Sequence, residues 1–514
     1  MIVVYHSCKK VTQIDDVDSG LELELRATTI AATLCNLATE FPDRLLVWCD
    51  EELSGRLDID SVGRLFSNKQ TMISYAAGAN YLQSAIGYVE DSTFININRD
   101  VRYATWQMSA DSGAIYGATL TAVAIDVRLS DDFGYFLNSV AKLAMPEGLF
   151  CYSEPRLLID RTTSATKTAD NRTLFCFVRQ HFKVTWVFLL LLNLFLYEKR
   201  FPIFAAIQSL FYRRRRFANQ EFSQIADSSD FNFADVSIDV LIPTIGRKKY
   251  LRDVLDDLAT QTLLPRKVIL VEQNPLPESE SELDYLSMSW PFEIKHIFTH
   301  RTGACHARNR GLVEFTADWL FFADDDIRLR PDFLEEAFAK ILALKGGAFN
   351  ICCLNRGKER EYDKIQQTYI FGAGCSIVSR ECLGNSRFDT AFEFGFGEDS
   401  DLGMQLMNKG FDIVYLPSPI VLHLKAPFGG FRVKPVHEWD SDKIQPKPAP
   451  TVLLFKRKHF SREQIYGYKT TLCLKFYRVQ SIKNPFSYLK HFRRQWQRSI
   501  YWSDKLLQNN NANP

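Results

Sequence analysis

From Ser237 onward the chain alternates short apolar stretches with amphipathic ones, and this alternation constrains the fold more than any other feature. Residues 238–243 form an apolar strand candidate, and the segment after them places apolar side chains at helical spacing. Residues 267–271 form a second strand candidate. Strands that alternate with helices predict a mostly parallel sheet, in which ligands bind beyond the carboxyl ends of the strands.

Two strand ends contribute polar side chains to this expected ligand edge. Thr244 and Arg247 follow the first strand and Glu272 follows the second, so the three side chains are predicted to converge. Residues 302–311 have Gly303 near their start and carry Arg308. A glycine before a basic helix start can approach phosphate groups and offer N–H donors. An ordinary helix with exposed arginines is the alternative.

The apolar stretch Trp319–Ala323 runs directly into Asp324, Asp325 and Asp326. Three adjacent carboxylates repel one another, so the arrangement costs stability unless a cation neutralises it. Mg²⁺ and Mn²⁺ prefer oxygen ligands and often complete their shell with substrate phosphates. A solvated acidic turn is the alternative. The apolar strand before the acids favours a divalent metal cofactor, Mn²⁺ or Mg²⁺, that shares the site with a diphosphate.

A second acidic cluster follows a glycine-rich turn, where Glu398 and Asp399 stand at the start of a predicted helix. A carboxylate there can cap the helix, or it can take a proton from an acceptor hydroxyl as a general base. Glycines beside it let a substrate approach the backbone closely. His423 lies in an apolar strand candidate. Such a histidine is more often a core residue, but near a carboxylate-held metal it is a candidate third ligand.

In their order along the chain, these features resemble the family-two glycosyltransferases with a GT-A fold. The resemblance rests on a strand that ends in Pro243-Thr244, a second strand that ends in an acid, the pattern G-x-x-x-A-R-N-x-G, the apolar strand into three aspartates, and G-E-D-x-D-L. It covers about residues 237–424, less than half of the chain. The combination is specific, whereas each piece alone is not.

The resemblance implies a donor pocket on the first two strands. Pro243, Thr244, Arg247 and Glu272 would line the pocket for the nucleotide base and ribose. The second strand ends in Glu-Gln-Asn rather than in the commoner Asp-rich turn, so the base contact departs from the family pattern.

The resemblance also implies a metal and diphosphate site. Asp324 would contact the ribose or the donor sugar and share the metal with Asp326, and Asp325 is assigned to donor binding beside them. Arg308 would lie near the diphosphate, and His423 would complete the metal site.

For the chemistry, the resemblance implies Asp399 as catalytic base and Glu398 as the holder of an acceptor or donor hydroxyl. The expected reaction is a single displacement with inversion, from a nucleotide-diphosphate sugar to a hydroxyl of a glycan or lipid-linked acceptor in surface polysaccharide synthesis. Two alternatives stay open. One is another nucleotide-diphosphate enzyme, such as a nucleotidyltransferase, and the other is a non-catalytic scaffold for glycan assembly.

The remaining sequence divides into three further regions around a catalytic domain at 236–434. Residues 1–158 are predicted to form an α/β domain, interpreted as a diverged GT-A-like unit, with a strand at 93–98 and a helix over 26–40. Residues 159–235 are interpreted as a linker that contains the apolar segment 184–212. Residues 435–514 are predicted to be basic and partly helical, with Phe486, Leu489, Phe492, Trp496 and Ile500 on one helical face.

Charge and cysteine content bear on partners and location. Net charge is +1, so bulk charge does not favour nucleic acid, and none is expected as a partner. Basic residues nevertheless concentrate between Arg179 and Arg216 and again after Thr451. Two basic zones and a 14-residue apolar run at Val184–Tyr197 favour contact with a membrane surface, although a buried helical pair fits the run equally well. Eleven cysteines without a C-x-x-C pair fit a reducing cytoplasm, so we expect a protein at the inner face of the cell membrane.

Overall fold

The computed structural model describes residues 1–7, 9–24, 29–124, 132–160, 168–217, 222, 232–233, 235–427 and 436–512. The chain divides into two compact units. Unit 1 comprises Met1–Ile225 with Phe460–Gln480, and unit 2 comprises Ala226–His459 with Ser481–Pro514. The chain therefore leaves unit 2 after His459 and returns to it at Ser481, so the C-terminal region is divided between the units.

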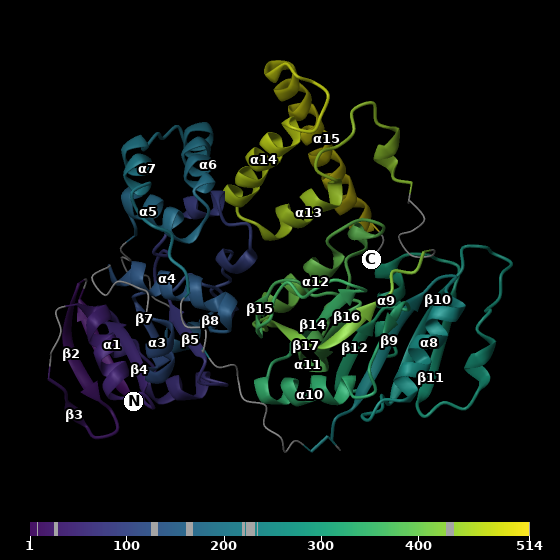
Figure 1. Cartoon of the computed structure of the whole chain (residues 1–514), viewed down its shortest axis with the longest axis horizontal. Coiled ribbons are helices and arrows are strands. Elements are labelled where there is room, and N and C mark those ends of the chain that lie inside the picture. Colours follow the sequence, from purple (N-terminus) through teal and green to yellow (C-terminus); the bar gives the residue numbers. More distant parts are fainter. Residues whose placement is uncertain are drawn as a thin grey trace. The chain divides into compact units, whose positions relative to one another are not determined.

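Unit 2 is built on a mixed sheet in the order β11-β10-β9-β12-β16-β14-β17-β13, with β15 paired to β17 (Figure 1). Strands β11, β10, β9 and β12 are parallel, whereas β16 runs antiparallel to both β12 and β14. This arrangement confirms the predicted α/β class. The described strands are β9 (Ile238–Thr244), β10 (Lys267–Gln273), β11 (Glu293–Thr299), β12 (Trp319–Ala323), β13 (Ile327–Arg328), β14 (Ala348–Asn355), β15 (Gln366–Thr368), β16 (Cys375–Ser379) and β17 (Ile413–His423).

The helices of unit 2 bury apolar faces where the periodicity predicts them. Helix α8 buries Leu251, Val254, Leu255 and Leu258, the four positions with helical spacing. Helix α9 packs closely on β9 and β10, because Gly311 leaves room for Leu241. The described helices are α8 (Lys248–Ala259), α9 (Ala304–Leu312), α10 (Phe333–Leu344), α11 (Arg380–Leu383), α12 (Glu398–Met407), α13 (Pro450–His459) and α15 (Pro485–Ala512).

Helix α15 confirms the predicted C-terminal helical region, but its apolar face is only partly covered. Phe492 and Trp496 are buried, whereas Phe486 and Leu489 are exposed. The helix packs against α13, and Trp502 donates from Nε1 to Asp442 at 2.7 Å. The predicted apolar face is thus partly packed within unit 2 and partly exposed.

Unit 1 contains a second sheet, in the order β3-β2-β1-β4-β7-β5-β8-β6. Its described strands are β1 (Ile2–Ser7), β2 (Lys10–Asp16), β3 (Leu21–Glu22), β4 (Leu45–Asp50), β5 (Thr71–Tyr75), β6 (Tyr103–Ala104), β7 (Ser112–Tyr116) and β8 (Phe150–Ser153). Its described helices are α1 (Ile30–Glu40), α2 (Ile59–Val62), α3 (Gly117–Val123), α4 (Phe133–Ala144), α5 (Asn171–His181), α6 (Thr185–Asn193), α7 (Ile203–Ser209) and α14 (Arg462–Tyr477).

The two sheets share a pattern of strand pairing. In unit 1, β1 is parallel to β4, β7 lies antiparallel between β4 and β5, and β5 is parallel to β8, whose other neighbour β6 is antiparallel. In unit 2, β9, β12, β16, β14, β17 and β13 repeat these pairings in the same order. The pairing extends to the residues before the acids, since Cys49 faces Ser112 and Ala323 faces Cys375.

Some local predictions for unit 1 need correction or fall outside the described residues. The predicted strand at 93–98 is wrong, because Thr93–Ile95 forms a 3₁₀ turn. A strand would use its backbone carbonyls to pair with a neighbouring strand, but here a side chain occupies one of them. The Tyr103 hydroxyl donates to the Thr93 carbonyl at 2.8 Å. The helix expected over 26–40 is described from Ile30. Residues 161–167 of the polar stretch at 160–173, most of the stretch at 217–235, the boundary at 434–435 and the last two residues lie outside the described residues.

The apolar segment 184–212 forms two short helices instead of one long one. Helix α6 ends in a π-helical turn at Leu194–Glu198, and α7 follows after Pro202. Both helices pack with α5, and α6 also packs on α14 (Figure 1). Among the described residues, no helix combines the length and apolarity needed to cross a bilayer.

Candidate active site

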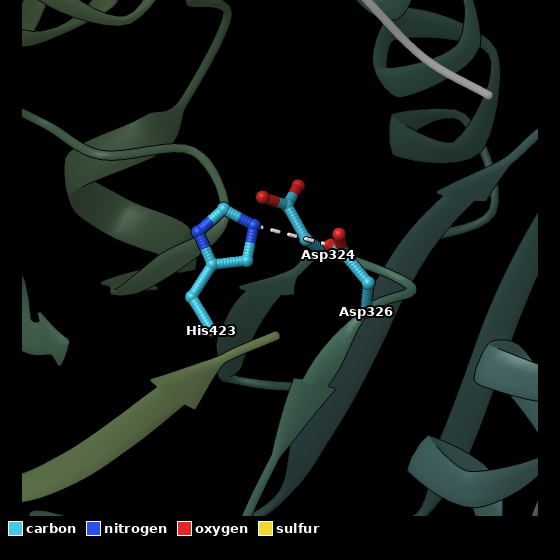
Figure 2. A group of neighbouring side chains, drawn as sticks. All are labelled: Asp324, Asp326 and His423. Atoms are coloured by element: carbon cyan, nitrogen blue, oxygen red, sulfur yellow. Dashed lines mark ion pairs between the residues drawn. The ribbon is translucent and has the colours of Figure 1, made fainter. Parts of the chain in front are cut away.

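Asp324, Asp326 and His423 lie together at the carboxyl end of β12 and the end of β17 (Figure 2). One ligand atom from each lies within 4.8 Å of the others, and His423 Nε2 is 3.2 Å from Asp326 Oδ1. Burial alone would raise the pKa of Asp326, but the bond from His423, the Ala426 N–H at 2.8 Å and the charge of Arg247 lower it. Asp326 is therefore kept in its anionic form, and the triad offers oxygen and nitrogen atoms that can coordinate Mn²⁺.

Asp325 does not join this triad. Its carboxylate is buried and accepts from the Thr244 hydroxyl at 2.7 Å and from Arg247 Nη1 at 2.6 Å. Burial nevertheless raises the pKa of Asp325 to about 6. Thr244 and Arg247 do converge on the acids, as predicted, and in this structure they hold Asp325. The assignment of these residues and of Pro243 to donor binding stays a prediction.

Glu272 lies at the end of β10, in register with Thr244 of β9. Its carboxylate is engaged, accepting from the Ser281 hydroxyl at 2.5 Å and lying 2.8 Å from His296 Nε2. Burial raises the pKa of Glu272, but these two bonds outweigh it and the net shift is downward. Glu272 thus belongs to the predicted edge, and its role in base binding stays a prediction.

Arg308 links the two acidic clusters. It is buried on α9, with Nη2 3.4 Å from Asp324 Oδ1 and Nη1 3.9 Å from Asp399 Oδ1. The Arg308 Nε and Asp399 Oδ1 atoms are buried and have no hydrogen-bond partner among the described residues. Unpartnered buried polar atoms are costly in a folded protein, so their presence here is consistent with a site built to hold a polar ligand.

Glu398 and Asp399 begin helix α12 after Gly397. Burial raises the pKa of Glu398 to about 7, and the charge of Asp399 adds to this effect. Burial also raises the pKa of Asp399, and Arg308 and the Ala373 N–H oppose the rise. Two neighbouring carboxyls with raised pKa values in a shared site are suited to proton transfer near neutral pH.

Sequence reasoning missed Gly374, which lies just before β16. A Cβ at this position would collide with the Asp324 carboxylate, and the Asp324 N–H donates to the Gly374 carbonyl at 3.3 Å. Glycine is therefore required for the close approach of this loop to the acids. The only sequence signal was the run Gly372-Ala373-Gly374.

Sequence reasoning also missed a set of residues that holds the helices of the site. Asp401 is fully buried on α12 and accepts from Lys458 Nζ at 2.6 Å, and it lies 2.7 Å from His459 Nε2. Burial would raise the pKa of Asp401, but the bond from His459 and the charge of Lys458 lower it. Lys458 also contacts Asp389 at 2.7 Å. Both basic residues come from α13, far along the sequence from the motifs.

The loop after Asp389 connects these contacts to α9, the helix that carries Arg308. Glu393 accepts from the Cys305 and His306 N–H groups at 3.1 and 2.9 Å, at the start of α9. A carboxylate at a helix N-terminus satisfies donors that lack partners within the helix. Gly303 permits this approach, because a Cβ there would collide with Glu393. The orientation of Arg308 therefore depends on residues outside the recognised motifs.

An α/β sheet edge that joins an Asp/Asp/His triad to a raised-pKa carboxyl pair defines a candidate metal-assisted transfer site. Residues 239–396 match the family Glycosyl transferase family 2. This segment of the chain is therefore a family-two glycosyltransferase domain, as the motif order indicates. The match ends just before Glu398 and does not reach His423.

Two curated relatives match the chain over a short stretch. Glycosyltransferase GlyA of Streptococcus pneumoniae serotype 4 is 28% identical over 114 residues, which are 21% of this chain and 15% of that protein. The uncharacterized glycosyltransferase YwdF of Bacillus subtilis is 28% identical over 106 residues, which are 21% of this chain and 38% of that protein. The chain thus matches less than half of either relative.

Among solved structures, S. aureus TarS 1-349 in complex with UDP-GlcNAc is 18% identical to this chain. The comparison covers 51% of this chain and 79% of that one, with a TM-score of 0.36. A similarity this low does not bear on the ligand of this chain.

Proposed function

We propose that this chain transfers a sugar, with inversion, from a nucleotide-diphosphate sugar to a hydroxyl group of a glycan or lipid-linked acceptor. We further propose that it acts in surface polysaccharide synthesis at the inner face of the cell membrane. The observation that carries the proposal is Arg308, which contacts Asp324 of the metal triad and Asp399 of the carboxyl pair. The Arg308 guanidinium thus lies between the residues proposed to bind the diphosphate leaving group and the residues proposed to activate the acceptor hydroxyl.

The residues fit a divalent metal. Asp324 and Asp326 offer carboxylate oxygens and His423 offers an imidazole nitrogen, and these ligand atoms lie close enough together for one ion to contact all three. These three residues would hold the ion, which when bound would neutralise charge on the diphosphate. Mn²⁺ is our preferred ion because the site contains a nitrogen ligand.

The chain's own residues account for the remaining steps. Asp399 takes the proton of the acceptor hydroxyl as its oxygen forms a bond to the anomeric carbon. The bond from that carbon to the diphosphate breaks on the opposite face, so the configuration inverts. Arg308 stays beside both groups and stabilises the negative charge that leaves with the diphosphate. Glu398, whose pKa burial raises to about 7, holds a sugar hydroxyl next to the base.

A test begins with a panel of nucleotide-diphosphate sugars and Mn²⁺, followed by release of nucleoside diphosphate with and without sugar acceptors. Asp399→Asn is expected to reduce turnover by about 10²–10⁴-fold, because the amide cannot accept the proton. Nucleotide affinity, measured by calorimetry, should stay near that of the parent chain. The anomeric configuration of the product, read by NMR, tests inversion.

Asp332→Asn is the matched control, since Asp332 is an exposed aspartate of the same unit outside the candidate site. It should keep full turnover. Turnover by the Asp399→Asn variant equal to that of the parent chain would reject Asp399 as the base, and a retained anomeric configuration would reject the single displacement.

A further inference from the structure

A set of apolar side chains on α6, α7, the segment between them and the turn after α7 faces solvent in unit 1. Phe204 and Phe211 are 86% and 85% exposed, values close to those of an unfolded chain. Soluble proteins rarely expose several large apolar side chains within one short segment without an interaction that covers them. We call this set the aromatic patch. Its members, each at least half exposed, are Phe188, Phe195, Phe201, Phe204, Ile207 and Phe211.

The patch is the outer face of helices that are firmly attached on their inner face. Helix α7 turns the small side chains of Ala206 and Ser209 inward. Helix α6 buries Val187 and Leu190, and Asn193 accepts from the Thr470 hydroxyl of α14 at 2.6 Å. The inner face is thus packed by described residues of unit 1, and the exposed phenylalanines lie on the opposite face.

Basic side chains follow the patch directly. Arg213, Arg214 and Arg216 are exposed, and the structure shows no ion pair for them among the described residues. Arg215 is turned inward instead, donating from Nη1 to the Ser139 hydroxyl at 2.8 Å and from its N–H to the Gln180 carbonyl at 2.8 Å. Arg215 therefore fixes the segment to unit 1 while its three neighbours point outward.

We propose that the aromatic patch and these three arginines dock unit 1 on a bilayer surface with anionic headgroups. Aromatic side chains beside cations suit the boundary between headgroups and acyl chains. Helices α6 and α7 contain 9 and 7 residues, about 14 and 11 Å at the usual helical rise. A hydrocarbon core is about 30 Å thick, so each helix suits an orientation along the interface.

Charge complementarity selects a lipid surface over a protein groove. An apolar protein groove would be matched by the phenylalanines alone, whereas the three adjacent exposed arginines, for which the described residues provide no ion pair, complement a dense anionic partner. Anionic headgroups supply that charge over a flat area, and clusters of basic residues beside apolar anchors bind them. The inference deepens the membrane part of the proposed function, and lipid binding is measurable without any sugar donor.

The test is flotation of the full chain with vesicles of phosphatidylcholine alone or with phosphatidylglycerol added at about a third of the lipid. We expect binding to the anionic vesicles only. The double variant Phe204→Ser/Phe211→Ser and the triple variant Arg213→Gln/Arg214→Gln/Arg216→Gln should each weaken it by roughly tenfold or more. Leu21→Ser is the matched control, because Leu21 is an exposed apolar residue of the same unit, on β3 away from α6 and α7 (Figure 1).

The outcomes distinguish a lipid surface from a second copy of this chain as the partner of the aromatic patch. Because the substituted residues are exposed, circular dichroism and thermal denaturation should match the parent chain. Absence of binding to anionic vesicles by the folded parent chain overturns the proposal, as does equal binding by the phenylalanine variant. A parent chain that sediments as a dimer, and a phenylalanine variant that sediments as a monomer, would instead assign the patch to a second copy of this chain. Sugar transfer that persists while lipid binding is absent would leave the enzymatic proposal standing.

Discussion

At the residue scale, the candidate site depends on how the pKa values of three carboxylates are shifted in different directions. Asp326 has a lowered pKa because His423, a backbone N–H and Arg247 favour its charge more than burial opposes it. Glu398 and Asp399 have raised pKa values, because burial dominates there. The surroundings therefore keep Asp326 anionic, as our proposed cation site requires, and raise the pKa of Glu398 and Asp399, as our proposed proton transfer requires.

Asp326→Ala should remove metal-dependent binding of nucleotide diphosphates. The triad would retain one carboxylate and one imidazole, too few protein ligands to hold a divalent ion firmly. Calorimetry with UDP and GDP, with and without Mn²⁺, measures this. The parent chain should bind one of them more tightly with Mn²⁺, and the variant should show no Mn²⁺ effect. A persistent Mn²⁺ effect in the variant would remove Asp326 from the metal site.

Glu398→Gln should change the dependence of stability on pH. The pKa of Glu398 rises from the ordinary 4.5 to about 7, so the folded chain retains a proton that the unfolded chain releases. Stability therefore falls as pH rises across that window, and the cost is fully present above it. The variant cannot ionise and should be more stable than the parent chain at pH 8, by roughly 1–3 kcal/mol.

Near pH 4.5 the advantage of Glu398→Gln should vanish, because the carboxyl is then protonated in the folded chain. Thermal denaturation at both pH values tests this. A difference in Tm that is the same at pH 4.5 and pH 8 would contradict the raised pKa.

At the element scale, α13 lies outside the family match but supports the catalytic helices. Lys458 and His459 hold Asp401 of α12, and Lys458 also holds Asp389 before the loop to Glu393. Glu393 in turn caps α9, which carries Arg308. A helix from the C-terminal region thus fixes the orientation of two helices that the motifs supply.

Lys458→Met should lower the free energy of unfolding by roughly 2 kcal/mol, because the fully buried Asp401 loses a charged partner. Arg457→Met on the same helix is the matched control, since it removes the partly exposed pair with Asp504 and a hydrogen bond to the Ser503 hydroxyl, and leaves no buried charge without its partner. Such a pair contributes about 0–1 kcal/mol. Urea denaturation measures both, and Lys458→Arg should recover part of the loss. If Lys458→Met and Arg457→Met lower the free energy of unfolding equally, the contacts of Lys458 with Asp401 and Asp389 do not stabilise the site.

At the scale of the whole molecule, the two sheets share their strand pairing but differ in the acids at the matching edge. Asp50 is the last residue of β4, whereas Asp324 directly follows β12. The Asp50 carboxylate accepts from the Glu52 N–H at 3.0 Å and caps a 3₁₀ turn. Glu51 and Glu52 are exposed on that turn. This supports our proposal that residues 1–158 are a diverged GT-A-like unit in which the acids have a structural role.

Calorimetry of the full chain should therefore find one Mn²⁺-dependent nucleotide site per chain. Asp50→Asn should leave the affinity and the stoichiometry unchanged, because Asp50 only caps its turn. A stoichiometry of two, or a loss of one site in Asp50→Asn, would identify a working site in unit 1.

The pattern of residues was enough to predict the α/β class of unit 2, the position of the acids at the edge of its sheet and the family of residues 239–396. Those features are local: an apolar strand that ends in charged residues must place them at the rim of the sheet, wherever the rest of the chain lies. Three features could not be predicted in this way: Asp325 turns toward Arg247, Lys458 and His459 support α12, and 93–95 forms a turn. Each of these depends on side chains that meet from distant parts of the chain, where burial and charge pairing outweigh local pattern.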